Sequence, residues 1–233
     1  MSQPSRHEIW KMFDRISPTY DRINKILSFG MDKNWRKEVI RHLPLRENLR
    51  LLDLATGTAD QLITLLESKA SIDSAVGIDL SSEMLQLGAK KIEAKPYRSR
   101  IQLLRADAEK IPFNDASFDA ATFSFGIRNV SDPLISLNEI YRVLKTKGRC
   151  LILEFSLPPV WIRGFYLFYL RRLLPKIGGL ISKQPAAYRY LNETIETFPS
   201  GKDFLALMEQ ASFQKVKAHR MAFGGVTLYV GEK

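Results

Sequence analysis

The chain has 233 residues, of which 45% are hydrophobic, a length and composition that exclude a disordered chain and suit one domain with a full core. A single cysteine, Cys150, excludes a disulfide framework and fits a reducing cytoplasm, and three scattered histidines indicate no metal site. The net charge of +10 points to acidic partners, either nucleic acid or anionic lipid. Without a signal core or a stretch of about eighteen uncharged apolar residues, we expect a cytoplasmic protein, soluble or peripheral to the inner face of the membrane.

Residues 8–43 carry apolar side chains at spacings of three and four, a period that predicts helices. Pro18 is expected to interrupt the first pattern and Gly30 the second. Because these helices precede the first predicted strand, they cannot belong to a sheet. We expect a lid beside a bound ligand, and a role in packing alone is the alternative.

The next stretch, RLLDLATGTAD (50–60), is typical of a buried strand that carries Asp53 into a turn of small residues around Gly57. Small side chains let a backbone approach a ligand held at the start of the following helix. A second apolar strand ends on Asp79, and Ser81 is placed to cap the helix behind it. A carboxylate about twenty residues beyond a glycine turn is where a Rossmann-type sheet binds the ribose hydroxyls of an adenosine.

Charge selects among the adenosine cofactors. A dinucleotide fingerprint needs a third glycine at position 60, where the pyrophosphate lies on the helix end, but this chain has Asp60 there. Asp53 and Asp60 would repel a pyrophosphate and suit a ligand with an ammonium and a sulfonium group. The turn therefore favours S-adenosyl-L-methionine over NAD or FAD, against the alternative of an ordinary strand–turn–helix that binds nothing.

Further along, residues 101–105, 118–125 and 149–155 read as the third, fourth and fifth strands, and Asp132 with Pro133 marks a helix start before the last of them. Alternating strands and helices indicate an α/β, Rossmann-like fold, a parallel sheet with helices on both faces. Ligands of such sheets bind at the carboxyl ends of the strands. Four polar side chains are expected there: Asp53, Asp79, Asp107 and Ser124.

Composition changes after Phe155, because no Asp or Glu occurs again before Glu193 whereas arginines and lysines do. Residues 161–174 are aromatic and apolar but carry three arginines, too many charges for a membrane span. Such a helix lies in a membrane interface with its arginines at the headgroups, or packs as a cap against the domain, and both interpretations stay open. Strands at 213–219 and 226–230 are expected to give the sheet an antiparallel edge.

These elements predict a single domain over residues 1–233 in four parts. The parts are a helical lid (1–45), a cofactor-binding core (46–157), a basic and aromatic cap (158–199), and a C-terminal helix with the closing strands (200–233).

Several motifs occur in order along nearly the whole chain. They are FDRISPTYDRINKILSFGMDKNWRK (13–37), DLATGTAD (53–60), SFGIRNV (124–130), RVLKTKGR (142–149), LEFS (153–156), YRYL (188–191) and AFGGVTLYVG (222–231). Together they resemble one family, the demethylmenaquinone/ubiquinone-precursor C-methyltransferases. SFGIRNV and the segment around Tyr20 and Asp21 are far more specific to that family than the glycine turn.

The resemblance implies a class I S-adenosylmethionine-dependent methyltransferase fold, with a seven-stranded sheet whose last strand is antiparallel. It implies methylation of a ring carbon of a polyprenylated hydroquinone in respiratory quinone biosynthesis. The chain departs from the usual turn at Thr56 and Ala59, where glycines are common, and at Asp107, where some members carry Asn. The family's cofactor positions map onto Thr58, Asp79, Asp107, Ala108 and Ser124.

The implied reaction is an SN2 transfer of the sulfonium methyl group to a ring carbon that becomes nucleophilic when a ring hydroxyl is deprotonated. A fixed cation beside the developing phenolate would help most. Arg128, with Asn129, follows the fourth strand and is our candidate, and an ion pair with a surface acid is the alternative. Tyr20 and Asp21 are candidates for the base.

Tyr188 and Arg189 are candidate substrate contacts, and His219 is more typical of a structural residue. Since a polyprenyl tail is insoluble, we expect the acid-free segment to contact an anionic membrane surface. Whether the acceptor is a naphthoquinol or a benzoquinol, and whether the chain forms a homo-oligomer, stay open.

Two other functions are compatible with parts of the chain. An RNA methyltransferase would suit the basic charge, but an amino-methylating turn is absent after the fourth strand, and Cys150 sits inside a strand rather than where a nucleophile would lie. No RNA-binding module is visible, so no nucleic-acid partner is expected. A non-catalytic membrane-surface protein with a degenerate cofactor fold is disfavoured by the intact acids Asp53, Asp79 and Asp107.

Overall fold

The computed structural model describes residues 8–176 and 185–233. These contain a seven-stranded sheet in the order β3-β2-β1-β4-β5-β7-β6, in which β7 runs antiparallel to both of its neighbours. The predicted Rossmann-like class is confirmed, but the antiparallel strand lies one position in from the edge, and β6 forms the edge itself. The strands are β1 (Leu49–Leu54), β2 (Ile72–Asp79), β3 (Ile101–Arg105), β4 (Phe118–Ser124), β5 (Leu144–Phe155), β6 (Gln214–Met221) and β7 (Val226–Glu232).

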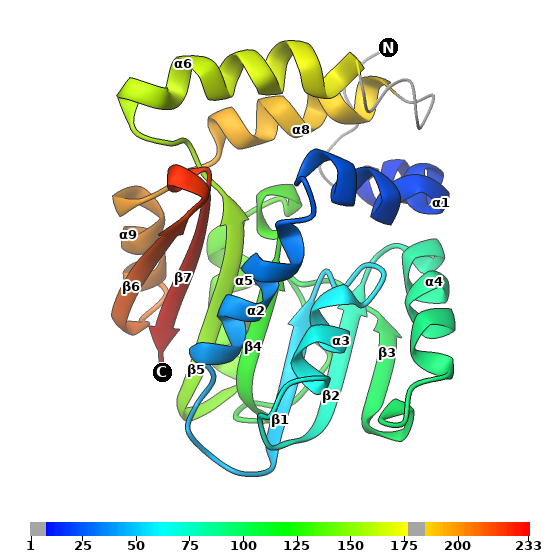
Figure 1. Ribbon diagram of the computed structural model, residues 1–233. Helices are drawn as coiled ribbons and strands as arrows, with labels where there is room; N and C mark the ends of the chain where they lie inside the picture. The colour runs from blue at the N-terminus through cyan, green and yellow to red at the C-terminus, as the bar shows by residue number, and fades with distance from the viewer. Residues whose placement is uncertain (1–7, 177–184) are drawn as a thin grey trace.

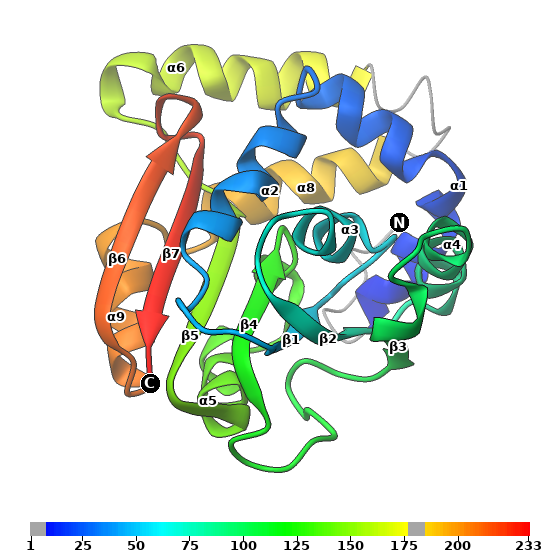
Figure 2. The ribbon, with the colours of Figure 1, turned by 60° about the horizontal axis from the view of Figure 1, so that its bottom comes forward.

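Helices cover both faces of the sheet (Figures 1 and 2). One face packs against α2 (Asp32–Arg41), α3 (Asp60–Leu66) and α4 (Ser82–Glu93), and the other against α5 (Pro133–Val143) and α9 (Lys202–Gln210). Because both faces are covered, the central strands are apolar almost throughout, as expected for parallel strands. The predicted caps are confirmed: Ser81 Oγ accepts from the Met84 amide, and the Asp132 side chain accepts from the Leu134 amide.

The prediction that Pro18 interrupts the first helix is wrong, since α1 (Ile9–Leu27) continues through it. Proline lacks the N–H that would bond to the carbonyl four residues earlier. That carbonyl, of Asp14, instead accepts from the Ser17 hydroxyl at 2.9 Å, which compensates for the missing bond. The helix ends near Gly30 as predicted, where φ is +72° and the Gly30 amide donates to the Lys25 carbonyl.

A third layer lies over the carboxyl ends of the parallel strands and consists of α1, α6 (Val160–Phe168) with its continuation η4 (Tyr169–Leu173), and α8 (Pro185–Thr197) (Figure 1). Its own apolar cluster includes Ile23 of α1, Leu170 of η4 and Ile195 of α8. By contrast α2, which belongs to the segment predicted as a lid, packs its Trp35 against the sheet. The sequence has a glycine pair at Gly178 and Gly179, typical of a break after the aromatic segment, and this pair lies outside the described residues.

Candidate active site

A cavity of about 130 Å³, here called the strand-end cavity, lies at the carboxyl ends of β1 to β4. Its wall holds many of the side chains that the sequence placed at this edge. Those wall residues are Gly57, Asp79, Asp107, Ala108, Ser124 and Asn129. The crossover topology brings them together from four separate segments, as open parallel sheets do.

Asp79 organises the wall of the strand-end cavity. One carboxylate oxygen accepts from the Gly57 amide and the other from the Ser81 amide, both at 2.8 Å. Burial raises the pKa of this carboxyl group above its usual value. Gly57 has φ +55°, and Ala55 and Ala59 beside it also have positive φ, a conformation that costs energy for residues with a β-carbon. The turn is thus held in a strained shape that exposes its backbone to the cavity.

Two of the predicted cofactor residues, Asp53 and Thr58, do not line this cavity. Asp53 is 1% exposed and lies beside Thr122 across the β1–β4 ladder, where the Thr56 and Thr122 hydroxyls donate to it at 2.7 and 2.5 Å. Burial raises its pKa to about 6. The Thr58 hydroxyl donates to Asp21 at 2.6 Å. Both residues therefore stabilise the glycine turn through hydrogen bonds on the side that faces away from the cavity.

Asp60, the residue expected to repel a pyrophosphate, also lies outside the wall. Its carboxylate forms an ion pair with Lys91 at 2.7 Å. The lysine neutralises the charge on which that electrostatic argument depended, so the turn geometry and Asp79 carry the case for the cofactor.

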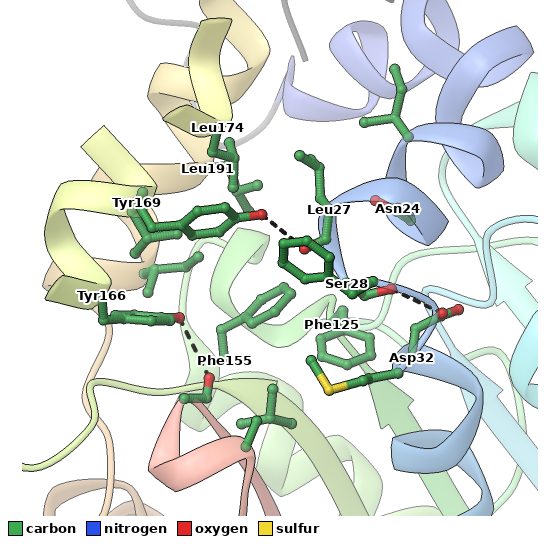
Figure 3. A pocket seen from close by; sticks show the side chains of 18 of the residues that line it. Asn24, Leu27, Ser28, Asp32, Phe125, Phe155, Tyr166, Tyr169, Leu174 and Leu191 are labelled. Carbon is green, nitrogen blue, oxygen red and sulfur yellow. Dashed lines mark hydrogen bonds between the residues drawn. The ribbon is translucent and has the colours of Figure 1, made fainter. Parts of the chain in front are cut away.

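A second cavity, of about 550 Å³ and here called the aromatic cavity, lies between the third layer and α2. Figure 3 shows the rings of Phe125, Phe155, Tyr166 and Tyr169 turned toward its centre, with the Tyr169 hydroxyl donating to the Leu27 carbonyl at 2.8 Å. Its volume is that of a site for a drug-sized ligand, and its wall is almost entirely apolar.

The two cavities meet at three shared residues, which are Phe13, Tyr20 and Phe125. A ligand in the strand-end cavity and a ligand in the aromatic cavity would therefore contact the same three side chains. Transfer of a group from one to the other fits this arrangement, because proximity and orientation alone lower the barrier of such a step.

The candidate bases are placed differently from each other. Tyr20 lies at the junction, but desolvation raises the pKa of its phenol, so at neutral pH it is a hydrogen-bond donor rather than a base. Asp21 lines neither cavity. Its carboxylate forms an ion pair with Lys91 at 2.5 Å and accepts from Thr58, which directs it away from the junction.

Arg128 lines the aromatic cavity and is buried. Its partner is not the surface acid considered from the sequence but Glu154 of β5, which is fully buried and lies 2.8 Å from the guanidinium. The guanidinium also donates to the Phe125 carbonyl at 2.5 Å and stacks on the Phe155 ring. Arg128 thus holds both aromatic side chains while Glu154 balances its charge.

Of the remaining predicted residues, Arg189 and His219 lie outside the walls of both cavities. The side chain of Tyr188 lies outside the described part of the chain, and Arg189 is exposed and outside the wall, which α8 supplies instead through Tyr190 and Leu191. His219 stacks on His42, with ring centroids 4.2 Å apart, and lines neither cavity.

Sequence reasoning missed several residues of the aromatic cavity and its support. Glu154 could have been found, because an acid inside an apolar strand needs a buried partner. Tyr166 and Tyr169 were noted only as aromatic composition, and nothing in the local pattern distinguishes Arg36, which also lines the cavity.

A test of the strand-end cavity against an adenosyl ligand comes from Asn129. Its side-chain oxygen is buried and has no hydrogen-bond partner among the residues that the structure describes. An unpartnered acceptor in the same wall as Asp79 and Asp107 is suited to a ligand rich in donors, and ribose hydroxyls, an adenine amino group and an ammonium group are such donors. The residues present therefore fit S-adenosylmethionine.

The Rossmann-like sheet and this acceptor-lined cavity define a class I S-adenosylmethionine-dependent methyltransferase. The chain belongs to the ubiE/COQ5 methyltransferase family, whose model matches residues 1–233. It is 43% identical over 227 residues to a ubiquinone/menaquinone biosynthesis C-methyltransferase of Geotalea uraniireducens, covering 97% of this chain and 96% of that one. It is 41% identical over 223 residues to a demethylmenaquinone methyltransferase of Thermus thermophilus, covering 95% and 100%.

Solved structures agree on the fold. The chain resembles a SAM-dependent methyltransferase from Aquifex aeolicus with a TM-score of 0.60 at 19% identity, covering 91% of this chain and 97% of the other. At that identity the likeness concerns the fold alone.

Proposed function

We propose that this enzyme transfers the methyl group of S-adenosylmethionine to a ring carbon of a polyprenylated hydroquinone, either demethylmenaquinol or the ubiquinol precursor. The observation that carries the proposal is the apolar, aromatic cavity that meets the strand-end cavity at Phe13, Tyr20 and Phe125. A flat aromatic ring with a hydrocarbon tail suits such a wall. The names of the relatives from Geotalea and Thermus support the same chemistry.

In this proposal the strand-end cavity holds the cofactor. Asp79 would accept from the ribose hydroxyls, Asp107 and Ala108 would contact the adenine, and Gly57, Ser124 and Asn129 would surround the amino-acid part, since all six residues line this cavity. Asp53 and Thr58 contribute from behind the turn. The cofactor supplies an activated methyl group, so the protein's task is alignment and charge stabilisation.

On the substrate side, Phe125 and Phe155, with ring centroids 4.7 Å apart, form a flat aromatic wall beside the junction. Arg128 fixes this wall, and Tyr20 is placed to donate a hydrogen bond at the point where the two ligands meet. Among the cavity's wall residues Asp32, the first residue of α2, is the acid, and the hydroxyl of Ser28 at the end of α1 donates to it at 3.0 Å. It replaces Asp21 as our candidate acceptor for the hydroxyl proton.

We further propose that the mouth of the aromatic cavity docks on an anionic membrane. No helix in the described ranges 8–176 and 185–233 is long and apolar enough to cross a bilayer. Yet α6 exposes Trp161, Phe165 and Phe168, and Phe29 and Phe223 are exposed on neighbouring loops. Phe29, Phe165 and Phe223 line the cavity as well, so the exposed apolar side chains surround its opening. Exposed Arg172 and Lys176 add positive charge at this end.

Both interpretations of the aromatic segment then hold at once. Leu170 and Leu174 are buried against the third layer, as a cap requires, whereas Trp161 and Phe165 are about three-quarters exposed, at 77% and 76%. A helix with this division buries one face in the protein and leaves the other for a lipid interface.

RNA methylation at cytosine carbon is disfavoured by Cys150, which is fully buried in β5 and whose thiol pKa is raised by burial. A thiol in that position is neither ionised nor accessible to the cytosine of an RNA.

The proposal predicts that the purified chain transfers labelled methyl groups from S-adenosylmethionine to demethylmenaquinol or the ubiquinol precursor in detergent micelles, and not to RNA. Mass spectrometry of the extracted quinone identifies the methylated product. Transfer to RNA with no transfer to either quinol, in a protein that binds the cofactor, would overturn the proposal.

A further inference from the structure

Arg36 is the second guanidinium in the wall of the aromatic cavity. Its guanidinium carbon lies 5.4 Å from the centroid of the Phe125 ring, one of the residues at the junction. The Arg36 carbonyl accepts from the Gln61 side chain, whose oxygen accepts in turn from Ser124 Oγ at 3.1 Å. These contacts fix the position of Arg36 relative to the strand-end cavity.

The two arginines of the cavity differ in how their charge is balanced. Arg128 is paired with Glu154. Arg36 forms no ion pair with any acid in residues 8–176 or 185–233, and its Nε is buried without a hydrogen-bond partner there. Asp32 lies one turn earlier on the same helix but accepts from Ser28 instead.

Arg36 is half-buried, and in a largely apolar wall its charge is stabilised by a ligand that supplies the opposite charge. The ring hydroxyl of a hydroquinone becomes that charge when it ionises. Arg36 also stacks on the ring that would flank the substrate, a position from which a planar guanidinium can donate to a ligand oxygen.

We propose that Arg36 is a catalytic residue that binds the ionised ring oxygen of the hydroquinone, whereas Arg128 with Glu154 positions the Phe125–Phe155 wall. This inference rests on the proposed function. The hydroxyl loses its proton to Asp32, which passes it to solvent. The electron pair left on the oxygen makes the ring carbon nucleophilic, and this carbon forms the new C–C bond as the S–C bond breaks and its electron pair stays on the sulfur. The ring carbon then releases its own proton, whose C–H pair restores the aromatic ring, and the oxygen is reprotonated. Arg36 stays charged throughout.

The field of Arg36 reaches the junction, since Arg36 and Arg128 both lower the pKa of Tyr20 against the larger upward effect of its burial. The titratable and charged groups that face the cavity come from every element around it. They are Tyr20 on α1, Asp32 and Arg36 on α2, Arg128 with Glu154 behind it, Tyr166 and Tyr169 on the aromatic segment, and Tyr190 on α8. Outside the cavity wall, Asp53 of β1 also interacts with Arg36, whose charge lowers the pKa of Asp53 against the larger upward effect of burial.

The test compares Arg36→Gln and Arg36→Lys with Arg41→Gln, a control on the same helix whose side chain is 77% exposed and paired with Glu38. We expect Arg36→Gln to lower kcat by about 100-fold at neutral pH, the usual cost of one lost oxyanion donor. The acidic limb of its pH–rate profile should move up by about one unit or more because the bound hydroxyl ionises less readily. Arg36→Lys should recover most of the rate, and Arg41→Gln should match the parent chain.

A second readout needs no turnover. The absorbance of 1-naphthol bound to the protein reports its ionisation, and we expect bound naphthol to ionise at lower pH in the parent chain than in Arg36→Gln. Affinity for S-adenosylmethionine, measured by calorimetry, should be unchanged in both Arg36 variants.

Three outcomes would decide against Arg36. They are full turnover of Arg36→Gln with an unshifted pH profile, equal naphthol ionisation in the two proteins, and equal loss in Arg36→Lys and Arg36→Gln, which would indicate a structural role. None of these touches the proposed function, which fails separately if the parent chain binds the cofactor but methylates neither quinol.

Discussion

At the scale of single residues, Asp53 shows how burial gives an acid a new role. It is closed off beneath the glycine turn, with two threonine hydroxyls bound to it, and burial raises its pKa to about 6. The folded protein therefore binds this proton more tightly than the unfolded chain, whose Asp titrates near 3.8. Stability from this group is present below about pH 4 and is lost as pH rises toward 6.

We predict that Asp53→Asn removes the decrease in unfolding free energy that Asp53 causes as the pH rises. Between pH 4 and pH 7 the parent chain should lose on the order of 3 kcal/mol of unfolding free energy through Asp53, since one pKa unit corresponds to about 1.4 kcal/mol. Urea unfolding of the cofactor-free protein at several pH values measures the slope. Asp73→Asn, on the exposed side of β2, is the matched control. The prediction is contradicted if the unfolding free energy of Asp53→Asn falls with pH as steeply as that of the parent chain.

At the scale of elements, α6 and its continuation η4 divide their side chains between two environments. Leu170 and Leu174 are buried in the apolar cluster that α1 and α8 also supply, and Trp161, Phe165 and Phe168 are exposed. Replacing the outer three does not open the core, so their effect on membrane binding can be separated from folding.

We predict that the triple variant Trp161→Ser, Phe165→Ser and Phe168→Ser keeps its thermal unfolding midpoint and loses at least tenfold in affinity for anionic vesicles, because the buried apolar area disappears. Cosedimentation with anionic and neutral vesicles gives the affinities. Leu45→Ser is the control, since Leu45 is 99% exposed away from the cavity wall. Equal binding of the parent chain to anionic and neutral vesicles would refute the role of electrostatic attraction. An unchanged vesicle affinity of the triple variant would refute the role of the aromatic side chains.

At the scale of the whole molecule, two cavities of different character share one junction. The strand-end cavity is lined mainly by the ends of the parallel strands, and the aromatic cavity, shown in Figure 3, is lined mainly by the helices above them. With about 550 Å³, the aromatic cavity has room for a ring and a short length of tail, so a long prenyl tail must leave through the exposed mouth.

From this volume we predict that kcat/KM depends on the length of the prenyl tail only for the first two prenyl units. In detergent micelles, kcat/KM should rise by at least tenfold from a hydroquinone without a tail to one with two prenyl units, and should then change less than threefold for longer tails. Methyl transfer measured over a series of synthetic quinols gives the dependence. A steady rise with every added unit would show that the cavity extends beyond its described walls.

The core of the site followed from local patterns because topology makes it inevitable. Apolar strands alternating with helices form a parallel sheet, and the ends of such strands meet, so Asp79, Asp107 and Ser124 could be placed together from their positions in the sequence alone. The caps at Ser81 and Asp132 were equally local, since each bonds to an amide within three residues.

Other features depended on contacts between distant segments. Asp53 and Thr58 stand next to the turn in sequence, yet their side chains point to Thr122 and Asp21, which no local pattern reveals. Glu154 pairs with an arginine 26 residues earlier, and Arg36 reaches the junction only because α2 packs across the sheet beside Phe125. The periodicity of apolar residues indicates which face of a helix or strand is buried. Whether a charged side chain on that element finds a partner from a distant segment is decided by packing in three dimensions.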